Sequence, residues 1–302
     1  METAKYIWMD GKLVKWDDAK IHVMTHSFHY GSAVFEGIRF YNINKNAKHC
    51  CAIFRLEEHI ERLFYSANKI GLKIKYSKEE IKREINKTVK ANNIKNGYIR
   101  PIVYYGYGSI EVVPTKNSAN FIIAVWPWKH SMRNKLLRIK ISPYIRIHHK
   151  STDINAKISG NYANSILAGL DAKKSGYDEA VMLDYDGNIA EATSENIFIV
   201  KNEKLLTPKS ENILPGITRD SIIQIAKDNK IKVAEKDISV HELLNSDEIF
   251  LAATAAEIIG VSSVNDKIVS EEEGIITKKI RKIFHSAITG KIKKYDKWLN
   301  YI

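Results

Sequence analysis

Short apolar runs separated by turn residues open the chain. Residues 6–9 and 12–14 are mostly apolar and flank Asp10-Gly11, a preferred two-residue type I′ turn. This pattern predicts a β-hairpin. Residues 98–105 and 121–126 are also predicted to be strands.

A helical period appears twice in the same half. In residues 57–70 the apolar positions share one face, and Gly71 marks the end of the helix. These positions are Ile60, Leu63, Phe64, Ala67 and Ile70. A second helix is predicted to start at Ser77, where Glu80 completes a capping box, and to run to about Ala91.

The second half continues this mixture of helices and strands. Helices are predicted at residues 161–174 (ended by Gly176), 218–228, 275 to about 294, and after the Ser239/Glu242 capping pair. Strands are predicted at 179–183 and 196–201 around the Asp186-Gly187 turn, at 204–207 after Asn202-Glu203, and at 249–252 leading into Thr254.

A change of composition at residues 127–134 divides the chain. Proline and polar residues lie there between two strand-like runs, and 302 residues suggest roughly two domains of about 100–200 residues each. We expect a small N-terminal α/β domain over residues 1–127, a connector over 128–137 and a larger C-terminal, cofactor-binding domain over 138–302. The predicted fold class is α+β or mixed α/β.

Composition indicates an ordinary globular core, with 44% hydrophobic and 10% aromatic residues. The apolar runs stay well short of the roughly 20 residues needed to cross a bilayer. The N-terminal residues lack the basic and apolar regions of a signal peptide. The neighbours Cys50 and Cys51 cannot form a disulfide framework, so a reducing compartment fits best. We therefore expect a cytoplasmic protein with no membrane partner.

The formal net charge of +12 raises the question of a nucleic-acid or anionic-membrane partner. The basic residues are spread along the chain and interleaved with acids, as in Lys78-Glu79-Glu80-Ile81-Lys82-Arg83-Glu84. This distribution favours a solvated, lysine-rich surface, and the chain contains no recognised nucleic-acid motif. A nucleic-acid-binding protein is the remote alternative, and it predicts an affinity that falls steeply with salt.

One lysine stands out by its neighbours. Lys157 lies in Ala156-Lys157-Ile158-Ser159-Gly160-Asn161-Tyr162, among small residues and just ahead of a predicted helix. A lysine amine becomes a nucleophile when its surroundings lower its pKa, and its usual use is a Schiff base with a carbonyl group. Because lysine is abundant in this chain, spacing alone does not distinguish this residue from a surface lysine.

Three other stretches offer what a pyridoxal phosphate site requires, namely a carboxylate for the ring nitrogen and donors for the phosphate. Glu191, at the start of residues 191–196, is the candidate carboxylate. Gly216-Ile217-Thr218 follows a proline and opens a helix, so its backbone N–H groups and the Thr218 hydroxyl could bind a phosphate. Thr254-Ala255-Ala256 could form a second phosphate loop or a substrate-carboxylate loop.

Each stretch also has a simpler interpretation. Glu191 could be a solvated turn carboxylate, Thr218 the N-cap of an ordinary helix, and residues 254–256 the end of a strand. Taken singly these signals are weak, and their weight comes from their occurrence together and in this order.

In this combination the chain resembles the class IV, fold type IV pyridoxal phosphate aminotransferases, and among them the branched-chain amino acid aminotransferases. The resemblance covers nearly the whole chain. It is carried by Asp10-Gly11 and by residues 29–39, 59–63, 98–101, 157–162, 191–196, 214–220 and 254–257. It implies a two-domain fold with the cofactor site between the domains, and a homodimer or a multiple of dimers with sites at the subunit interface.

The resemblance implies roles for the cofactor-binding residues. Lys157 would be the catalytic residue, holding pyridoxal 5′-phosphate as an aldimine and moving the proton. Tyr162 would hydrogen-bond the phenolate oxygen, and Glu191 would pair with the pyridine nitrogen. The phosphate would be bound by Arg62, Ile217, Thr218 and Thr254.

It also implies a substrate pocket. Tyr30, Phe35 and Gly37 would line an apolar space for a branched side chain, although ordinary core packing is the alternative for Tyr30 and Phe35. Tyr98 and Arg100 would stand nearby, with Arg100 binding the distal carboxylate of glutamate in a bidentate manner. The substrate α-carboxylate would lie at Thr254 and Ala255.

One position departs from the family pattern. Many branched-chain enzymes place a pocket tyrosine three residues beyond a tryptophan, and here that position is Ser131, after Trp128. The pocket could be wider or wetter, or another side chain could fill it. Whether aromatic substrates enter stays open, as does the ranking of leucine, isoleucine and valine.

The spacing of His22, His26 and His29 could suggest a metal site. Carboxylates and cysteines are not placed there to complete a coordination shell, so we expect no metal.

The expected function is transamination of L-leucine, L-isoleucine or L-valine with 2-oxoglutarate, in a ping-pong reaction with one covalently held cofactor. The rivals within the class are a D-amino acid aminotransferase and an aminodeoxychorismate lyase. Residues 35–39 and Arg100 argue against both.

Overall fold

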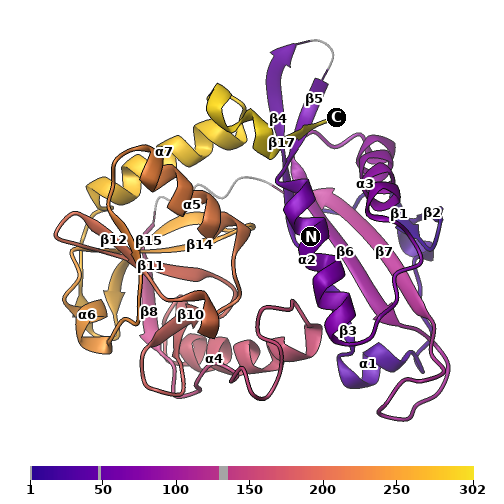
Figure 1. Cartoon of the computed structure of the whole chain (residues 1–302), viewed down its shortest axis with the longest axis horizontal. Coiled ribbons are helices and arrows are strands. Elements are labelled where there is room, and N and C mark those ends of the chain that lie inside the picture. Colours follow the sequence, from indigo (N-terminus) through magenta and orange to yellow (C-terminus); the bar gives the residue numbers. More distant parts are fainter. Residues whose placement is uncertain (1, 47–48, 129–134) are drawn as a thin grey trace. The chain divides into compact units, whose positions relative to one another are not determined.

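The computed structural model describes residues 2–46, 49–128 and 135–302, apart from the side chains of 44–46 and 49–50. It contains helices and two sheets in two compact units (Figure 1). The first unit comprises Met1–His130, Ala156–Gly160 and Ala287–Ile302, and the second comprises Ser131–Asn155 and Asn161–Ser286. The fold class is therefore the predicted one. Two segments from the second half of the chain, Ala156–Gly160 and Ala287–Ile302, nevertheless belong to the first unit. The boundaries 1–127, 128–137 and 138–302 remain a prediction, and residues 129–134 of the connector lie outside the described residues.

The first unit is built on one sheet, whose described strand pairs are antiparallel, with the strand order β17-β5-β4-β6-β7-β1-β2, and β3 pairs with β6. Its strands are β1 (Tyr6–Met9), β2 (Lys12–Lys15), β3 (Ala33–Phe35), β4 (Ile38–Asn46), β5 (His49–Phe54), β6 (Gly97–Tyr105), β7 (Ala119–Pro127) and β17 (Leu299–Tyr301). Its helices are α1 (His26–Tyr30), α2 (Leu56–Lys69) and α3 (Lys78–Asn92), with 3-10 turns at Trp16–Asp18 and Lys293–Trp298.

Local chemistry explains several of these elements. Asp10 and Gly11 both have positive φ, 43° and 96°, as a type I′ turn requires, which confirms the predicted hairpin. Helix α3 begins with the predicted capping box, because Ser77 accepts from the Glu80 backbone and the Glu80 side chain accepts from Ser77. Gly71, with φ 73°, follows the end of α2.

The core of the first unit lies between its sheet and the helices α2 and α3 (Figure 1). Helix α2 contributes Ile60 and Leu63, α3 contributes Ile81 and Ile85, and the facing strands contribute alternate residues such as Ile99 and Val103 of β6. The helical period of 3.6 and the strand period of 2 bring these apolar positions together.

The second unit contains a mixed sheet with the order β10-β9-β8-β15-β14-β11-β12-β13, and β16 pairs with β15. Its strands are β8 (Leu137–Ile141), β9 (Glu179–Leu183), β10 (Ile189–Ala192), β11 (Asn196–Lys201), β12 (Lys204–Thr207), β13 (Val233–Glu235), β14 (Glu248–Ala253), β15 (Glu257–Val264) and β16 (Lys267–Ile268). Its helices are α4 (Tyr162–Lys174), α5 (Ile217–Asp228), α6 (Val240–Leu244) and α7 (Ile275–Ile288), with 3-10 turns at Ser159–Asn161 and Ser210–Asn212.

Both faces of this sheet are covered. Val181 of β9 joins a core with Ile249 and Leu243, whereas its neighbours Ala180 and Met182 pack against α4. Successive side chains of a strand point to opposite faces, so α4 and the residue Leu243 of α6 lie on opposite sides of β9.

The predicted strands at residues 179–183 and 196–201 are confirmed as β9 and β11. The strand that pairs with β9 across the Asp186-Gly187 turn is β10, which was not predicted, and β11 lies between β12 and β14. The prediction that the last helix reaches about residue 294 was wrong. The last helix ends at Ile288 because Gly290 adopts a left-handed conformation with φ 67°. Among the described residues, the helices are too short or too polar to span a membrane.

Candidate functional site

The backbone of Lys157 is held from two sides within the first unit. Its N–H donates to Ser66 Oγ at 2.9 Å, and its carbonyl accepts from Phe35 N at 3.2 Å. The next residue, Ile158, bridges to Val34 of β3. The predicted catalytic lysine therefore lies between helix α2 and strand β3.

The small residues after Lys157 allow a close backbone approach. Gly160 N donates to Gly31 O at 3.0 Å, and a Cβ added to Gly31 would lie 2.8 Å from Gly160 Cα. Gly31 also has φ 62°, which favours glycine. Side chains at this crossing would push the Lys157 segment away from the end of α1.

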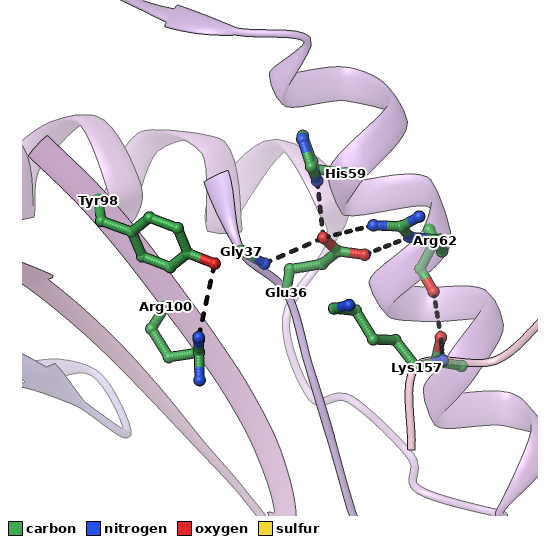
Figure 2. Close-up of polar contacts among 8 residues, drawn as sticks. Glu36, Gly37, His59, Arg62, Tyr98, Arg100 and Lys157 are labelled. Carbon is green, nitrogen blue, oxygen red and sulfur yellow. Dashed lines mark hydrogen bonds and ion pairs between the residues drawn. The ribbon is translucent and has the colours of Figure 1, made fainter. Parts of the chain in front are cut away.

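Arg62 belongs to a buried ionic network (Figure 2). Its Nε donates to Glu36 Oε1 at 2.5 Å and its Nη2 to Glu36 Oε2 at 3.0 Å. His59 Nδ1 lies 2.6 Å from Glu36 Oε2, and Gly37 N donates to the same oxygen at 3.1 Å. Glu36 is thus a fully buried carboxylate held by two side chains of α2 and by the adjacent backbone.

Electrostatics assign charges to this network. Burial would raise the pKa of Glu36, but the Arg62 guanidinium and the hydrogen bonds hold it well below its usual range. Burial also lowers the pKa of His59, so we assign a neutral ring that donates its Nδ1 proton to Glu36. The opposite charges of Arg62 and Glu36 leave the guanidinium in a fixed orientation.

Arg100 is surrounded by aromatic rings. Its Cζ atom lies 4.7 Å from the Phe35 ring centroid, 5.4 Å from that of Tyr98 and 6.0 Å from that of Trp126. Its Nη2 donates to Tyr98 Oη at 3.5 Å (Figure 2), and among the described residues its buried Nε has no hydrogen-bond partner. Such a cation in an aromatic wall can bind an anionic group of a ligand.

Gly37 and Phe35 complete this group. A Cβ at Gly37 would lie 1.8 Å from Tyr98 Oη, so glycine is required for the tyrosine to take this position. The Phe35 ring centroid is 5.1 Å from Lys157 Nζ. The structure therefore brings together Phe35, Gly37, Tyr98, Arg100 and Lys157.

Tyr30 is oriented differently. Its hydroxyl donates to Ile110 O at 2.9 Å, its ring lies 4.7 Å from that of His26, and 44% of the residue is exposed. Its place in a substrate pocket remains a prediction. The departure at Ser131 lies outside the described residues.

In the second unit, Glu191 is the centre of another buried network. Its carboxylate accepts from Arg146 Nε at 2.7 Å, Asn196 Nδ2 at 3.1 Å and Leu214 N at 3.2 Å. It is therefore not the solvated turn carboxylate of the simpler interpretation, since only 5% of it is exposed.

The neighbouring helix start fits an anion. Helix α5 begins at Ile217, and its N-cap, Gly216, makes no side-chain capping bond. A Cβ at Gly216 would lie 1.9 Å from Asn196 Oδ1, so the helix start packs directly on the residue that holds Glu191. Thr218 is buried inside the first turn and is not the N-cap. The N–H groups of a helix's first turn and the helix dipole favour a phosphate at such a terminus.

Thr254, Ala255 and Tyr162 lie at the ends of elements in the second unit. The first two belong to the loop between β14 and β15, where Ala253 pairs with Glu257 and Glu257 has φ 58°. Tyr162 is the first residue of α4. Their roles toward a cofactor or substrate remain predictions.

The histidines near α1 have structural partners. His26 contacts Ser32 Oγ and Glu111 O, and His29 contacts Val23 O. Among the described residues, His, Cys, Asp and Glu side chains do not gather in groups of three that could hold a metal ion.

Sequence reasoning missed the supporting side chains Glu36, His59, Ser66, Arg146 and Asn196. Glu36, His59 and Asn196 lie inside motifs that carry the family resemblance. For Glu36 the available signal was a charged residue between the apolar Phe35 and Ile38. For Arg146 and Ser66 we find no local signal, because their importance depends on contacts across 45 and 91 residues.

These residues fit pyridoxal phosphate. They supply a lysine amine, a buried carboxylate for a ring nitrogen, a helix start with a glycine N-cap for a phosphate and an aromatic wall with a cation. The donor and acceptor types match what the cofactor and an amino acid substrate require.

Comparisons with known proteins agree. The family model Amino-transferase class IV matches residues 33–264. The branched-chain-amino-acid aminotransferase of Pseudomonas aeruginosa is 38% identical over 297 residues, covering 97% of this chain and 95% of that protein. Two solved structures are also similar. The branched-chain aminotransferase of Thermoproteus uzoniensis with norvaline has a TM-score of 0.93 and 38% identity and covers 99% of each chain.

The second solved structure is a branched-chain amino acid aminotransferase of T.th., complexed with N-(5′-phosphopyridoxyl)-L-glutamate. It has a TM-score of 0.95 and 36% identity, covering 100% of this chain and 99% of that one. Fold, motifs and sequence identity thus agree over nearly the whole length, and the chain belongs to the class IV aminotransferases, with their type IV fold.

Proposed function

We propose that this protein is a branched-chain amino acid aminotransferase that uses pyridoxal 5′-phosphate. It transfers the amino group of L-leucine, L-isoleucine or L-valine to 2-oxoglutarate and yields a branched-chain 2-oxo acid and L-glutamate. The observation that carries this assignment is Arg100, a cation within an aromatic wall whose Phe35 ring also faces Lys157 Nζ.

That arrangement suits two different substrates. A branched side chain is favoured against the rings of Phe35, Tyr98 and Trp126 because it leaves water. The distal carboxylate of glutamate is favoured by Arg100, whose planar guanidinium can donate two parallel hydrogen bonds. The similar structures hold norvaline in one case and a phosphopyridoxyl-glutamate adduct in the other, which supports both halves of the reaction.

The chain's own residues divide the work. The bound cofactor supplies an electron sink for the charge that develops at the substrate Cα. Lys157 Nζ holds the cofactor and moves the Cα proton. Glu191, oriented by Arg146 and Asn196, would accept a hydrogen bond from the ring nitrogen, and Tyr162 would donate one to the phenolate oxygen.

The anionic ends are bound by other groups. Arg62, the N–H groups of Ile217 and Thr218, and Thr254 bind the phosphate, and the Thr254-Ala255 loop receives the substrate α-carboxylate. Among these, the start of α5, whose N-cap is Gly216, is the feature of the structure that best supports phosphate binding.

We also propose a cytoplasmic homodimer or a multiple of dimers. In the first unit, apolar residues on and beside α1 and in the adjoining loop 106–118 are strongly exposed, such as Phe28 at 72%, Val112 at 71% and Val113 at 68%. A ring contact between His22 and Tyr107 joins these two segments. An apolar surface of this kind is typical of an interface, and a second copy of the chain is the expected partner.

The direct test is Lys157→Ala, with the exposed Lys150→Ala as its control. The Lys157 variant should fold, lose the visible absorbance of lysine-bound cofactor and lose transamination of leucine, whereas the Lys150 variant should keep all three properties. Retained turnover in Lys157→Ala would remove this lysine from the mechanism. Activity of the unmodified protein with D-alanine but not L-leucine would overturn the substrate assignment.

A further inference from the structure

The hydroxyl of Ser66 links the backbone of Lys157 to helix α2. Lys157 N donates to Ser66 Oγ at 2.9 Å, and Ser66 Oγ donates to Arg62 O at 2.7 Å. Ser66 is fully buried, so water does not substitute for either partner. The hydroxyl is thus used as donor and acceptor at once.

The opposite side of Lys157 is held by backbone. Phe35 N of β3 donates to the Lys157 carbonyl at 3.2 Å, and the Phe35 ring centroid lies 5.1 Å from Nζ. Of these two hydrogen bonds to the lysine backbone, the bond to Ser66 alone depends on a side chain. It can therefore be removed without changing the main chain.

We propose that Ser66 is a positioning residue, which holds the Lys157 backbone so that Nζ reaches both the cofactor and the substrate Cα. This inference rests on the proposed function of Lys157. Helix α2 then serves two purposes with one face, because His59, Arg62 and Ser66 are spaced by three and four residues along it (Figure 2 shows the first two in contact with Glu36). A displacement of about 1 Å at a reacting group can cost about 100-fold in rate.

The test compares Ser66→Ala with Thr88→Val. Thr88 is also fully buried on a helix of the same unit, and its hydroxyl donates to Glu84 O at 2.6 Å, four residues earlier, as Ser66 does to Arg62. The control therefore removes the same kind of hydrogen bond, from a hydroxyl to a carbonyl of its own helix. Within the part of the chain that the structure describes, the Thr88 hydroxyl is not hydrogen-bonded to Lys157.

For Ser66→Ala we expect kcat to fall about 10- to 100-fold in both half-reactions, with KM for leucine and glutamate changed less than about threefold. For Thr88→Val we expect kcat within about twofold of the unmodified protein. Ser66→Thr, which keeps a hydroxyl, should recover part of the loss. If Ser66→Ala is too unstable to assay, Ser66→Cys replaces it.

A second readout needs no turnover. In cofactor-free protein, hydrogen exchange of the Lys157 amide should accelerate at least about tenfold in Ser66→Ala and stay unchanged in Thr88→Val. Unchanged exchange, or a kcat within twofold of the unmodified protein, would overturn the positioning role. Failure of the proposed function would look different, since the unmodified protein itself would then neither bind the cofactor at Lys157 nor transaminate leucine.

Discussion

Replacement of Gly37 by alanine should displace Tyr98. The added Cβ would lie 1.8 Å from Tyr98 Oη and 2.8 Å from Cζ, whereas ordinary contacts begin at 3.4 Å. The hydroxyl must therefore move by at least 3.4 − 1.8 = 1.6 Å. Gly37 does not have positive φ, so the backbone itself accepts alanine and the clash is the whole effect.

Tyr98 has little room to move. It is buried, and its ring lies 5.0 Å from that of Trp126 and 5.4 Å from that of Trp128. Overpacking of this kind typically costs about 1–3 kcal/mol. For a protein of this size the expected fall in Tm is roughly 2–5 °C.

The displacement should also affect Arg100, whose Nη2 lies 3.5 Å from Tyr98 Oη. We expect kcat/KM for glutamate to fall by about tenfold or more, because the guanidinium loses its orienting neighbour. The assays are thermal unfolding and the two half-reactions measured separately.

Two companion variants sharpen the test. In a Tyr98→Phe background the nearest clash is relaxed from 1.8 to 2.8 Å, so Gly37→Ala should cost less there, which a double-mutant cycle detects. Gly169→Ala in α4 meets its nearest atom at 3.4 Å and should be neutral or stabilising. A Gly37→Ala protein with unchanged Tm and unchanged glutamate kinetics would refute the reasoning.

Two further predictions concern carboxylates whose pKa is shifted in the folded protein. Glu36→Gln leaves Arg62 without its buried counter-charge and should lower the free energy of unfolding by about 3–5 kcal/mol at neutral pH, whereas Glu61→Gln, at an exposed pair with Lys78, should change it little. Because the pKa of Glu36 is lowered on folding, its contribution to the free energy of unfolding is complete above about pH 4.5 and is lost as the pH falls. Denaturant unfolding of both variants across that pH range checks this. A difference in unfolding free energy between the two variants that does not change with pH would contradict it. Burial and the nearby Glu179 raise the pKa of Glu195 to about 7, so the protein should lose stability, by at most about 3 kcal/mol, as the pH rises from 4.5 through 7. Glu195→Gln should flatten that slope in thermal unfolding, and an equal slope in both proteins would show that another group causes it.

Local signals predicted the elements whose ends have their own chemistry. Asp10-Gly11 and the Ser77/Glu80 box specify a turn and a helix start without help from distant residues. The last helix was extended past Ile288 because apolar periodicity continued while Gly290 received no weight. Strand β10 was missed since four residues give too little alternation to distinguish a strand from a turn.

The candidate site also contains residues that local sequence signals predicted and residues that they did not. Motifs indicated Lys157 and Glu191, whose residue types suit the proposed chemistry. Their supports, Ser66 and Arg146, are common residues that gain importance only through long-range contacts, which the chain order does not reveal. For the same reason the sequence did not predict that residues 156–160 belong to the first unit, because their partners are in α2 and β3.

The pairing of β17 with β5 has a consequence for biosynthesis. Leu299 pairs with Phe54, so 299 − 54 = 245 residues separate the two partners. At translation speeds of about 5–20 residues per second, β5 waits roughly 12–50 s on the ribosome for its neighbour. During that time its outer edge offers unpaired N–H and C=O groups to other nascent chains. The N-terminal unit, although begun first, is therefore the one that finishes last.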